Sequence, residues 1–205
     1  MKLITSGFTH PTHEAQTIFR QVLDAISSPG SLHTFKADFT FGLANSATTQ
    51  LLLALTDNST PVWLSSVLRH NETLTQNVKF HTNAPLAEST DTACFAVMAE
   101  NETVDLTTFS WGSAEYPETN TTLTIQVSGF NRGETLSLSG PGIDGQRTVC
   151  VDGIDNELLK QITQIQRSQP LGIDVLLTSG NQLMALPRTT HIELSNREAL
   201  TCTLQ

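Results

Sequence analysis

Apolar positions near the start of the chain recur with the period of an α-helix. They follow the i, i+3, i+4, i+7 template of one helical face, at Ala15, Ile18, Phe19, Val22, Leu23 and Ile26. Pro11 suits the first turn, because the N–H that it lacks would have no partner there. The segment Ser27-Ser28-Pro29-Gly30 predicts the end of the helix, since proline cannot continue it and glycine adopts the positive φ of a turn.

Three later segments also predict helices. Residues 44–55 have a helical pattern, and Asn45 or Ser46 can cap the first turn. Residues 72–81 and 156–166 place their large apolar side chains at helical spacing.

Short apolar runs bounded by turn residues alternate with these helices, and each run is typical of a β-strand. The predicted strands are 31–35, 61–64, 92–99, 121–127, 134–139, 148–151, 173–178, 182–186 and 190–194. In 121–127, apolar residues alternate with polar partners, which is the period-two pattern of a strand.

Turn residues join two pairs of these strands. Asn131-Arg132-Gly133 predicts a hairpin within 121–139, and Ser179-Gly180-Asn181 predicts one within 173–186. Such hairpins exclude an all-parallel sheet. Helices and strands interleave without a linker or a repeat, so we expect an α/β fold: a single domain over residues 1–205, with a mixed β-sheet flanked by helices.

The composition is that of an acidic globular chain with few charges. Its length of 205 residues suits one domain. Charged residues make up 15% of the chain, against roughly 25% in typical domains, so Thr, Ser, Asn and Gln supply most of the polar surface. The net charge is −9 and the basic residues are scattered, which disfavours nucleic acids and anionic membranes as partners.

No segment predicts export or membrane insertion. The first residues lack the apolar run of a signal peptide, and no stretch approaches the ~18 apolar residues of a membrane span. Cys94, Cys150 and Cys202 are odd in number and widely spaced, so they predict neither a disulfide framework nor a zinc motif. We therefore expect a cytoplasmic protein.

Familiar catalytic and cofactor motifs are missing from the sequence. Gly140-Pro141-Gly142 lacks the lysine of a phosphate-binding loop and is interpreted as a turn that ends a strand. His10 and His13 are interpreted as polar capping residues at the N-terminus of a helix, because no third metal ligand lies nearby. The lysines are interpreted as solvated surface residues rather than Schiff-base lysines; they are Lys2, Lys36, Lys79 and Lys160. We predict no cofactor and no metal.

One loop near the C-terminal end collects polar groups. Proline interrupts an apolar strand, and Arg188 then follows, beside Thr189, Thr190 and His191. These donors can hold a phosphate or a carboxylate. In the alternative, Arg188 pairs with a carboxylate such as Asp174 and locks the loop, or it crosses a subunit interface. These five residues are the candidates for ligand binding or an interface, and no catalytic residue is assigned.

The same region resembles a known family. Residues 170–180 and 183–193 resemble the C-terminal signature of the H subunit of bacterial carbon-phosphorus lyase, a protein of phosphonate metabolism. Further blocks follow in the same order: Ala15-Gln16-x-x-Phe19-Arg20, Ser28-Pro29-Gly30, Thr60–Leu64, Phe80–Leu86, Thr121–Val127 and Leu138–Ile143. The resemblance spans the chain and is weakest around 100–120 and 153–168.

The resemblance has implications for fold and partners. It implies a fold similar to a reduced large domain of the pyridoxal-phosphate transferases, without the cofactor or its lysine. It also implies membership of a complex with G, I and J subunits, which converts ATP and an alkylphosphonate to a ribose 1-phosphonate 5-triphosphate and adenine. The J subunit, a radical S-adenosylmethionine iron-sulfur protein, is the direct contact that it implies, and the isolated chain is expected to form a homodimer.

Two hypotheses about the molecular role follow. In the first, the chain has an assembly or structural role in this complex, without an active site of its own, since the family pattern establishes no catalytic residue. In the second, the Arg188 loop binds phosphonate or nucleotide directly.

Overall fold

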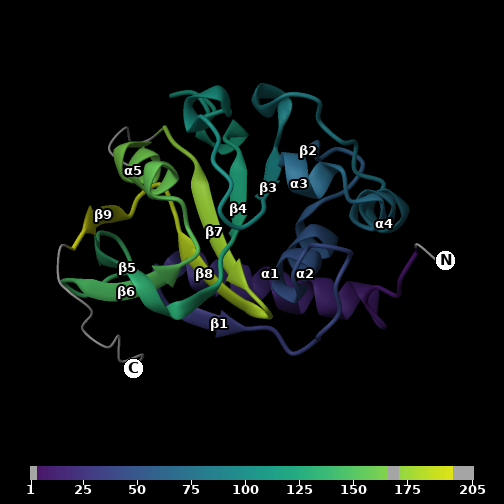
Figure 1. Ribbon diagram of the computed structural model, residues 1–205, viewed down its shortest axis with the longest axis horizontal. Helices are drawn as coiled ribbons and strands as arrows, with labels where there is room; N and C mark the ends of the chain where they lie inside the picture. The colour runs from purple at the N-terminus through teal and green to yellow at the C-terminus, as the bar shows by residue number, and fades with distance from the viewer. Residues whose placement is uncertain (1–3, 166–170, 196–205) are drawn as a thin grey trace.

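The computed structural model describes residues 4–165 and 171–195, and Figure 1 shows how its elements are arranged. The helices are α1 (Pro11–Ser27), α2 (Ser46–Leu55), α3 (Ser66–Arg69), α4 (Glu72–Thr82) and α5 (Asn156–Ile165). The strands are β1 (Leu32–Thr34), β2 (Val62–Leu64), β3 (Phe95–Met98), β4 (Thr122–Gln126), β5 (Gly129–Ser139), β6 (Arg147–Asp152), β7 (Asp174–Ser179), β8 (Gln182–Leu186) and β9 (His191–Leu194). The predicted helices and strands are confirmed, with bounds that differ by a few residues, except that residue 166 of the predicted helix 156–166 lies outside the described residues. The short α3 was not predicted.

A mixed six-stranded sheet forms the centre of the molecule, with the order β1-β8-β7-β4-β3-β2. Strands β7, β4, β3 and β2 run parallel to one another, and β8 runs antiparallel to both of its neighbours. The β7–β8 pair, joined at Gly180, confirms the hairpin predicted within 173–186 and the mixed character of the sheet.

The hairpin predicted within 121–139 is wrong. Both sides of β4 are taken by β3 and β7, so β5 has no edge of β4 to pair with. Instead, β5 pairs with β6 and β9 in a separate antiparallel sheet. The turn signal at Asn131-Arg132-Gly133 lies inside β5, where the pairing with β6 shifts register between Gly129 and Glu134. These residues therefore form an irregularity within β5, of the kind that bends a strand, rather than a turn that connects two strands.

The elements stack in three layers. Helices α1, α2, α3 and α4 pack on one face of the six-stranded sheet, around buried side chains such as Ile18 and Leu51. The opposite face packs against the smaller sheet and α5, around Leu136 and Leu158. Helices therefore cover one face of the mixed sheet, as expected. The other face is covered by the smaller sheet together with α5.

The period-two pattern of β4 separates two cores. Leu123 and Ile125 face the layer of the smaller sheet, whereas Thr124, between them, is fully buried on the other side. Its hydroxyl has no hydrogen-bond partner among the described residues. Strands in the middle of a parallel sheet are covered on both faces, so the polar positions of β4 are buried as well.

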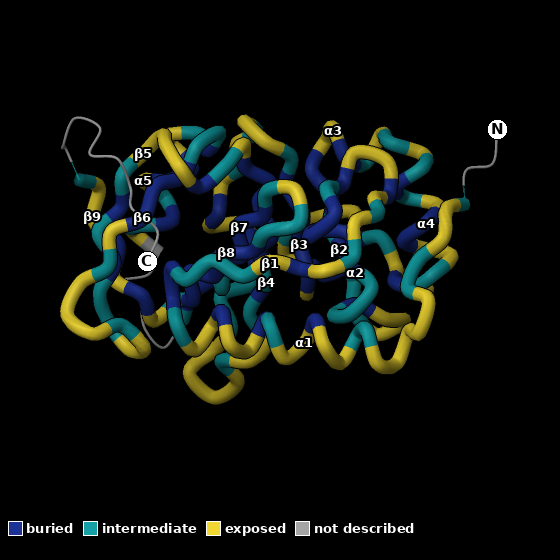
Figure 2. The backbone as a smooth tube through the Cα atoms, turned by 90° about the horizontal axis from the view of Figure 1, so that it is seen from below, coloured by how far each residue is buried: buried dark blue, intermediate teal, exposed yellow. Residues whose placement is uncertain are grey.

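Only part of the apolar pattern of α1 faces the core. Ile18 and Val22 are buried, but Phe19, Leu23 and Ile26 are 46%, 48% and 36% exposed. Figure 2 shows α1 along the rim of the molecule, with exposed residues on its outer side. The apolar face predicted from the sequence is therefore divided in two. One stripe is buried against the sheet and α2, and the other, formed by Phe19, Leu23 and Ile26, is left exposed; we call it the open stripe.

The cysteines of the described residues differ in their environment. Cys150 is buried in β6 and takes part in a disulfide, whereas Cys94 is exposed and free; the cysteine count alone therefore did not exclude a disulfide. Among residues 4–165 and 171–195, no helix is long and apolar enough to cross a membrane.

Candidate functional site

The loop from β8 to β9 ties together segments that are distant in the sequence. The backbone N–H of Arg188 donates to Oδ1 of Asp174 at 2.9 Å, and Nη1 of Arg188 donates to the carbonyl oxygen of Pro117 at 2.6 Å. The other carboxylate oxygen of Asp174 accepts from Nδ2 of Asn120 at 2.9 Å. Arg188 therefore locks the loop, but its guanidinium binds a backbone carbonyl and does not pair with the Asp174 carboxylate.

The other predicted residues of this loop do not converge with Arg188 on one ligand position. Thr189 and His191 are exposed. Thr190 is fully buried, and its hydroxyl has no partner in the described part of the chain. Its backbone N–H closes the loop by donating to the carbonyl of Pro187 at 2.8 Å. The structure thus brings Arg188 and Asp174 together, through the backbone of Arg188.

This loop lies at the edge of the sheet where the parallel strands begin. Asp174 is the first residue of β7, and Asn120 precedes β4. Ligands in open α/β sheets bind outside the opposite edge, where parallel strands end. The position of the Arg188 loop therefore favours a structural or interface role over a ligand site.

The edge where the parallel strands end holds a pocket that the sequence reasoning missed. Its volume is about 420 Å³, and its walls come from the segment 40–45, from Glu100 after β3, from residues 126–128 at the end of β4, and from Gly180 after β7. We call it the carboxyl-edge pocket. The only signal in the sequence was a polar residue soon after each of several apolar strands, and that pattern is common in loops.

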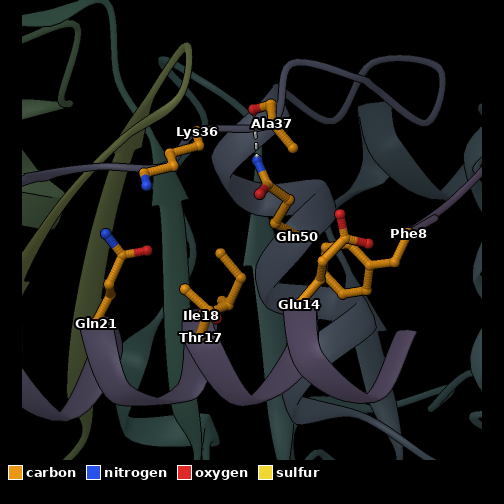
Figure 3. A pocket seen from close by; sticks show the side chains of 8 residues that line it. All are labelled: Phe8, Glu14, Thr17, Ile18, Gln21, Lys36, Ala37 and Gln50. Carbon is orange, nitrogen blue, oxygen red and sulfur yellow. Dashed lines mark hydrogen bonds between the residues drawn. The ribbon is translucent and has the colours of Figure 1, made fainter. Parts of the chain in front are cut away.

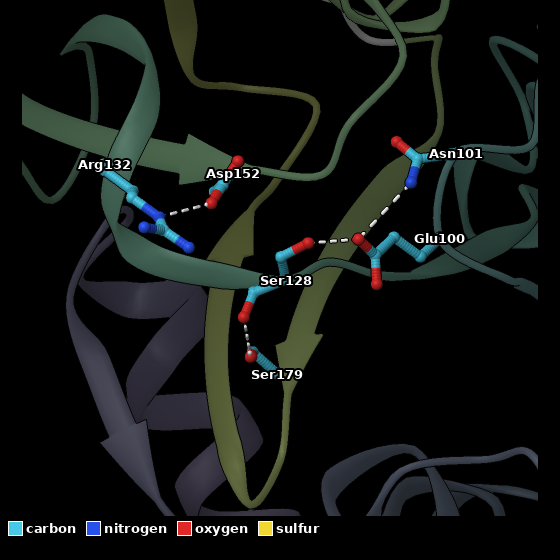
Figure 4. A network of polar contacts seen from close by, with 6 residues as sticks. All are labelled: Glu100, Asn101, Ser128, Arg132, Asp152 and Ser179. Atoms are coloured by element: carbon cyan, nitrogen blue, oxygen red, sulfur yellow. Dashed lines mark hydrogen bonds and ion pairs between the residues drawn. The ribbon is translucent and has the colours of Figure 1, made fainter.

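Figure 4 shows the polar contacts beside this pocket. The hydroxyl of Ser128 donates to Oε1 of Glu100, which also accepts from Nδ2 of Asn101 at 3.3 Å. The carbonyl of Ser128 accepts from the hydroxyl of Ser179 at 3.0 Å. The segment after β3 is therefore linked to the segment after β4 through the Glu100 carboxylate, and the segment after β4 is linked to the end of β7 through Ser179.

A second cavity of about 240 Å³ lies between α1, α2 and the chain that follows β1. Phe8 and Ile18 give it apolar walls, and Glu14 and Lys36 stand near its rim (Figure 3). Gln50 holds the segment opposite α1 by donating to the carbonyl of Ala37 at 3.0 Å. The cavity combines two opposite charges with an apolar wall and has no convergent set of polar groups.

The described lysines and histidines do not form a cofactor or metal site. Lys36, Lys79 and Lys160 are exposed, which confirms their interpretation as surface residues; Lys2 lies outside the described residues. The predicted capping role is wrong for both histidines: His10 is the N-cap residue of α1 but its side chain makes no capping hydrogen bond, and His13 lies within the helix. In the described ranges, no group of three or more His, Cys, Asp and Glu side chains could hold a metal ion.

Shifted carboxyl groups mark turns rather than a reactive centre. The hydroxyl and the N–H of Ser59 donate to Asp57 and lower the pKa of its carboxyl, with help from the hydroxyl of Thr60. The hydroxyl and the N–H of Thr107 lower the pKa of Asp105 in the same way. Both residues are exposed and their carboxyls close local turns, so neither carboxyl is poised for proton transfer.

These features define a three-layer α/β protein with an open pocket at the carboxyl edge of its parallel strands and a locked loop at the amino edge. Over residues 6–193, the chain matches the family described as "Bacterial phosphonate metabolism protein (PhnH)". The chain belongs to this family, which confirms the resemblance found in the sequence.

Two relatives match over most of their length. The chain is 30% identical over 197 residues to "Alpha-D-ribose 1-methylphosphonate 5-triphosphate synthase subunit PhnH" of Rhizobium meliloti (strain 1021), which covers 94% of this chain and 96% of that one. It is 35% identical over 179 residues to "Putative C-P lyase subunit protein HtxG" of Stutzerimonas stutzeri, covering 87% of this chain and 86% of that one. Both relatives are named as subunits of phosphonate-processing assemblies.

Proposed function

We propose that the chain is a subunit of a carbon-phosphorus lyase core complex and has an assembly role in it, without a complete active site of its own. The observation that carries the proposal is the match to named subunits over nearly the full length of both chains. A similarity that is spread over most of both chains, rather than confined to one motif, supports the same place in an assembly.

The proposal includes finer features that the sequence resemblance implied. The complex converts ATP and an alkylphosphonate to a ribose 1-phosphonate 5-triphosphate and adenine in the cytoplasm. Its other members are G, I and J subunits, with J in direct contact, and the isolated chain forms a homodimer. The fold is a reduced large domain of the pyridoxal-phosphate transferases, without the cofactor or its lysine. In support of this, the lysines of the described residues, Lys36, Lys79 and Lys160, are all exposed, whereas a Schiff-base lysine is buried.

Two surface features support an assembly role. The open stripe on α1 presents Phe19 and Leu23, and neighbouring large apolar side chains left exposed are typical of protein contacts. The surface is also poor in charge, and the cores of protein interfaces are depleted in charged residues, whose desolvation costs free energy.

Co-expression tests the proposal directly. The G, I and J partners are expressed with and without this chain, and the complex is captured through a tag on a partner. We expect this chain in the captured complex, and a loss of phosphonate turnover when it is left out. A complex of G, I and J that forms and turns over equally well without the chain would contradict the proposal.

Arg188→Ala distinguishes the assembly role from direct ligand binding by the Arg188 loop. We expect a lower yield of the complex, because the 2.6 Å bond to Pro117 that holds two loops together is lost, at a cost of about 1.5–3 kcal/mol for a hydrogen bond from a charged donor. The complex that does form should turn over phosphonate at the normal rate. Lys160→Ala, which removes an exposed cation from α5, is the control; normal yield with lost turnover in Arg188→Ala would favour direct binding.

A further inference from the structure

The carboxyl-edge pocket has a rigid floor. Nε2 of Gln126 donates to the carbonyl of Leu43 at 3.1 Å, and its Oε1 accepts from the backbone N–H of Asn45 at 2.5 Å. The side-chain Nδ2 of Asn45 in turn donates to the backbone carbonyl and to the hydroxyl of Thr178 in β7, each at 3.2 Å. Gln126 is more than nine-tenths buried, so the 43–45 segment is clamped to two strands of the sheet. A ligand here meets a surface that is already ordered, which lowers the entropic cost of binding.

The lining disfavours anions, although the N-terminus of α2 lies beside the pocket. The backbone N–H of Ala47 donates to the carbonyl of Gly180 at 2.8 Å, and that of Thr48 donates to Oδ1 of Asn45 at 2.9 Å. Two of the amides that a phosphate would use at a helix start are thus taken by the protein itself. No Lys or Arg lines the pocket, and Glu100 adds a negative charge.

The acceptor that the pocket offers is the Glu100 carboxylate. Its Oε1 is held by Ser128 and Asn101, while Oε2 has no partner among the described residues. An ionised carboxylate accepts hydrogen bonds and donates none. The ligand therefore supplies donors, and one carboxylate can accept from two adjacent hydroxyl groups, as acidic residues after a β-strand do with the ribose of dinucleotides.

The remaining lining offers polar and apolar contacts to a sugar. The hydroxyls of Thr40 and Ser128 can exchange hydrogen bonds with further hydroxyls of a ligand, and Leu43 and Val127 offer apolar contact to its C–H groups. We propose that the carboxyl-edge pocket binds the vicinal diol of a ribosyl group, with Glu100 as its acceptor and without contact to a phosphate.

Binding to the purified full chain tests this proposal by titration calorimetry. The probes are adenosine, 2′-deoxyadenosine and inorganic phosphate. We expect adenosine to bind saturably, 2′-deoxyadenosine to bind about tenfold or more weakly, because a hydrogen bond to a charged acceptor is lost, and phosphate neither to bind nor to compete. Absence of adenosine binding, equal affinity for the two nucleosides, or competition by phosphate would each overturn the proposal.

Two variants assign the effect to the carboxylate. In Glu100→Gln the preference for adenosine over 2′-deoxyadenosine should fall to about one, since the charged acceptor is gone. Ser128→Ala keeps the charge but removes the hydroxyl that orients it, so the preference should fall several-fold. Glu115→Gln, an exposed residue beyond the opposite edge of the sheet, is the matched control, and a preference that survives in Glu100→Gln would overturn the assignment.

This test is independent of the assembly proposal. It measures a ligand on the isolated chain, whereas assembly is measured by capture with partner subunits. A chain that joins the complex but shows no ribosyl preference would overturn the pocket alone, and a chain that binds adenosine but never joins the complex would overturn the assembly role alone.

Discussion

Replacing Phe19 and Leu23 together by serine is expected to reduce capture of the chain by its partner subunits by at least about a hundredfold. Truncation of a buried apolar anchor at an interface costs about 2 kcal/mol or more, and each 1.4 kcal/mol is about a factor of ten in affinity. Both side chains are about half exposed on the open stripe of α1, so their apolar surface is free to be covered by a partner. The measurement is the yield of the captured complex at equal expression.

The same double substitution should leave the fold intact, because neither side chain belongs to the buried cores. The free energy of unfolding, measured with urea, is therefore expected to stay within about 0.5 kcal/mol of the wild-type value, as for surface positions in general. Phe80→Ser is the matched control: Phe80 is 67% exposed on α4, away from the stripe. Normal capture of the double variant, or an equal loss with Phe80→Ser, would show that the α1 stripe is not the assembly surface.

Replacing Gly142 by alanine is expected to destabilise the fold by about 3 kcal/mol or more. Gly142 has φ +82°, where an L-residue carries a strain of about 1–2 kcal/mol. Its added Cβ would also lie 2.1 Å from the carbonyl oxygen of Ser27 and 2.9 Å from Cδ of Pro29. Relief of such overpacking requires backbone shifts that cost typically another 1–3 kcal/mol. Urea unfolding followed by circular dichroism measures the loss.

Gly145→Ala separates strain from collision. Gly145 also has a positive φ, +68°, but a Cβ there meets no atom within 4 Å, so we expect a loss of only about 1–2 kcal/mol. Equal losses in the two variants would mean that the contact with Ser27 is not tight. The contact matters because Nη1 of Arg147, on β6, donates to the carbonyl of Pro29 at 2.6 Å at the same junction. The end of α1 and the smaller sheet are held together there.

Local signals predicted the helices well because capping and periodicity act within a few residues. Asn45 was one of two candidates for the cap of α2, and its side chain accepts from the N–H of Thr48. Leu158 and Ile162, at helical spacing in the predicted helix 156–166, are buried in α5. Gly180 joins the β7–β8 hairpin as expected. In each case, the energy that selects the structure is contained in the segment itself.

Pairing between distant segments was harder to predict. Asn131-Arg132-Gly133 has the composition of a hairpin turn, but β3 and β7 occupy the edges of β4. The partner of the Arg188 guanidinium is a backbone carbonyl, that of Pro117. A backbone carbonyl exists at every residue, so no side-chain pattern could have indicated it.

The sequence by itself determined the elements, the mixed α/β class and the family, since periodicity, turn residues and ordered motif blocks are all written along one dimension. The tertiary structure decided which apolar stripe of α1 stays open, which edge of the sheet holds the Arg188 loop, and that Glu100, Gln126 and Gly180 line one pocket. These outcomes depend on which surfaces are already covered by neighbours. That competition for hydrogen-bonding edges and apolar cover involves the whole chain at once.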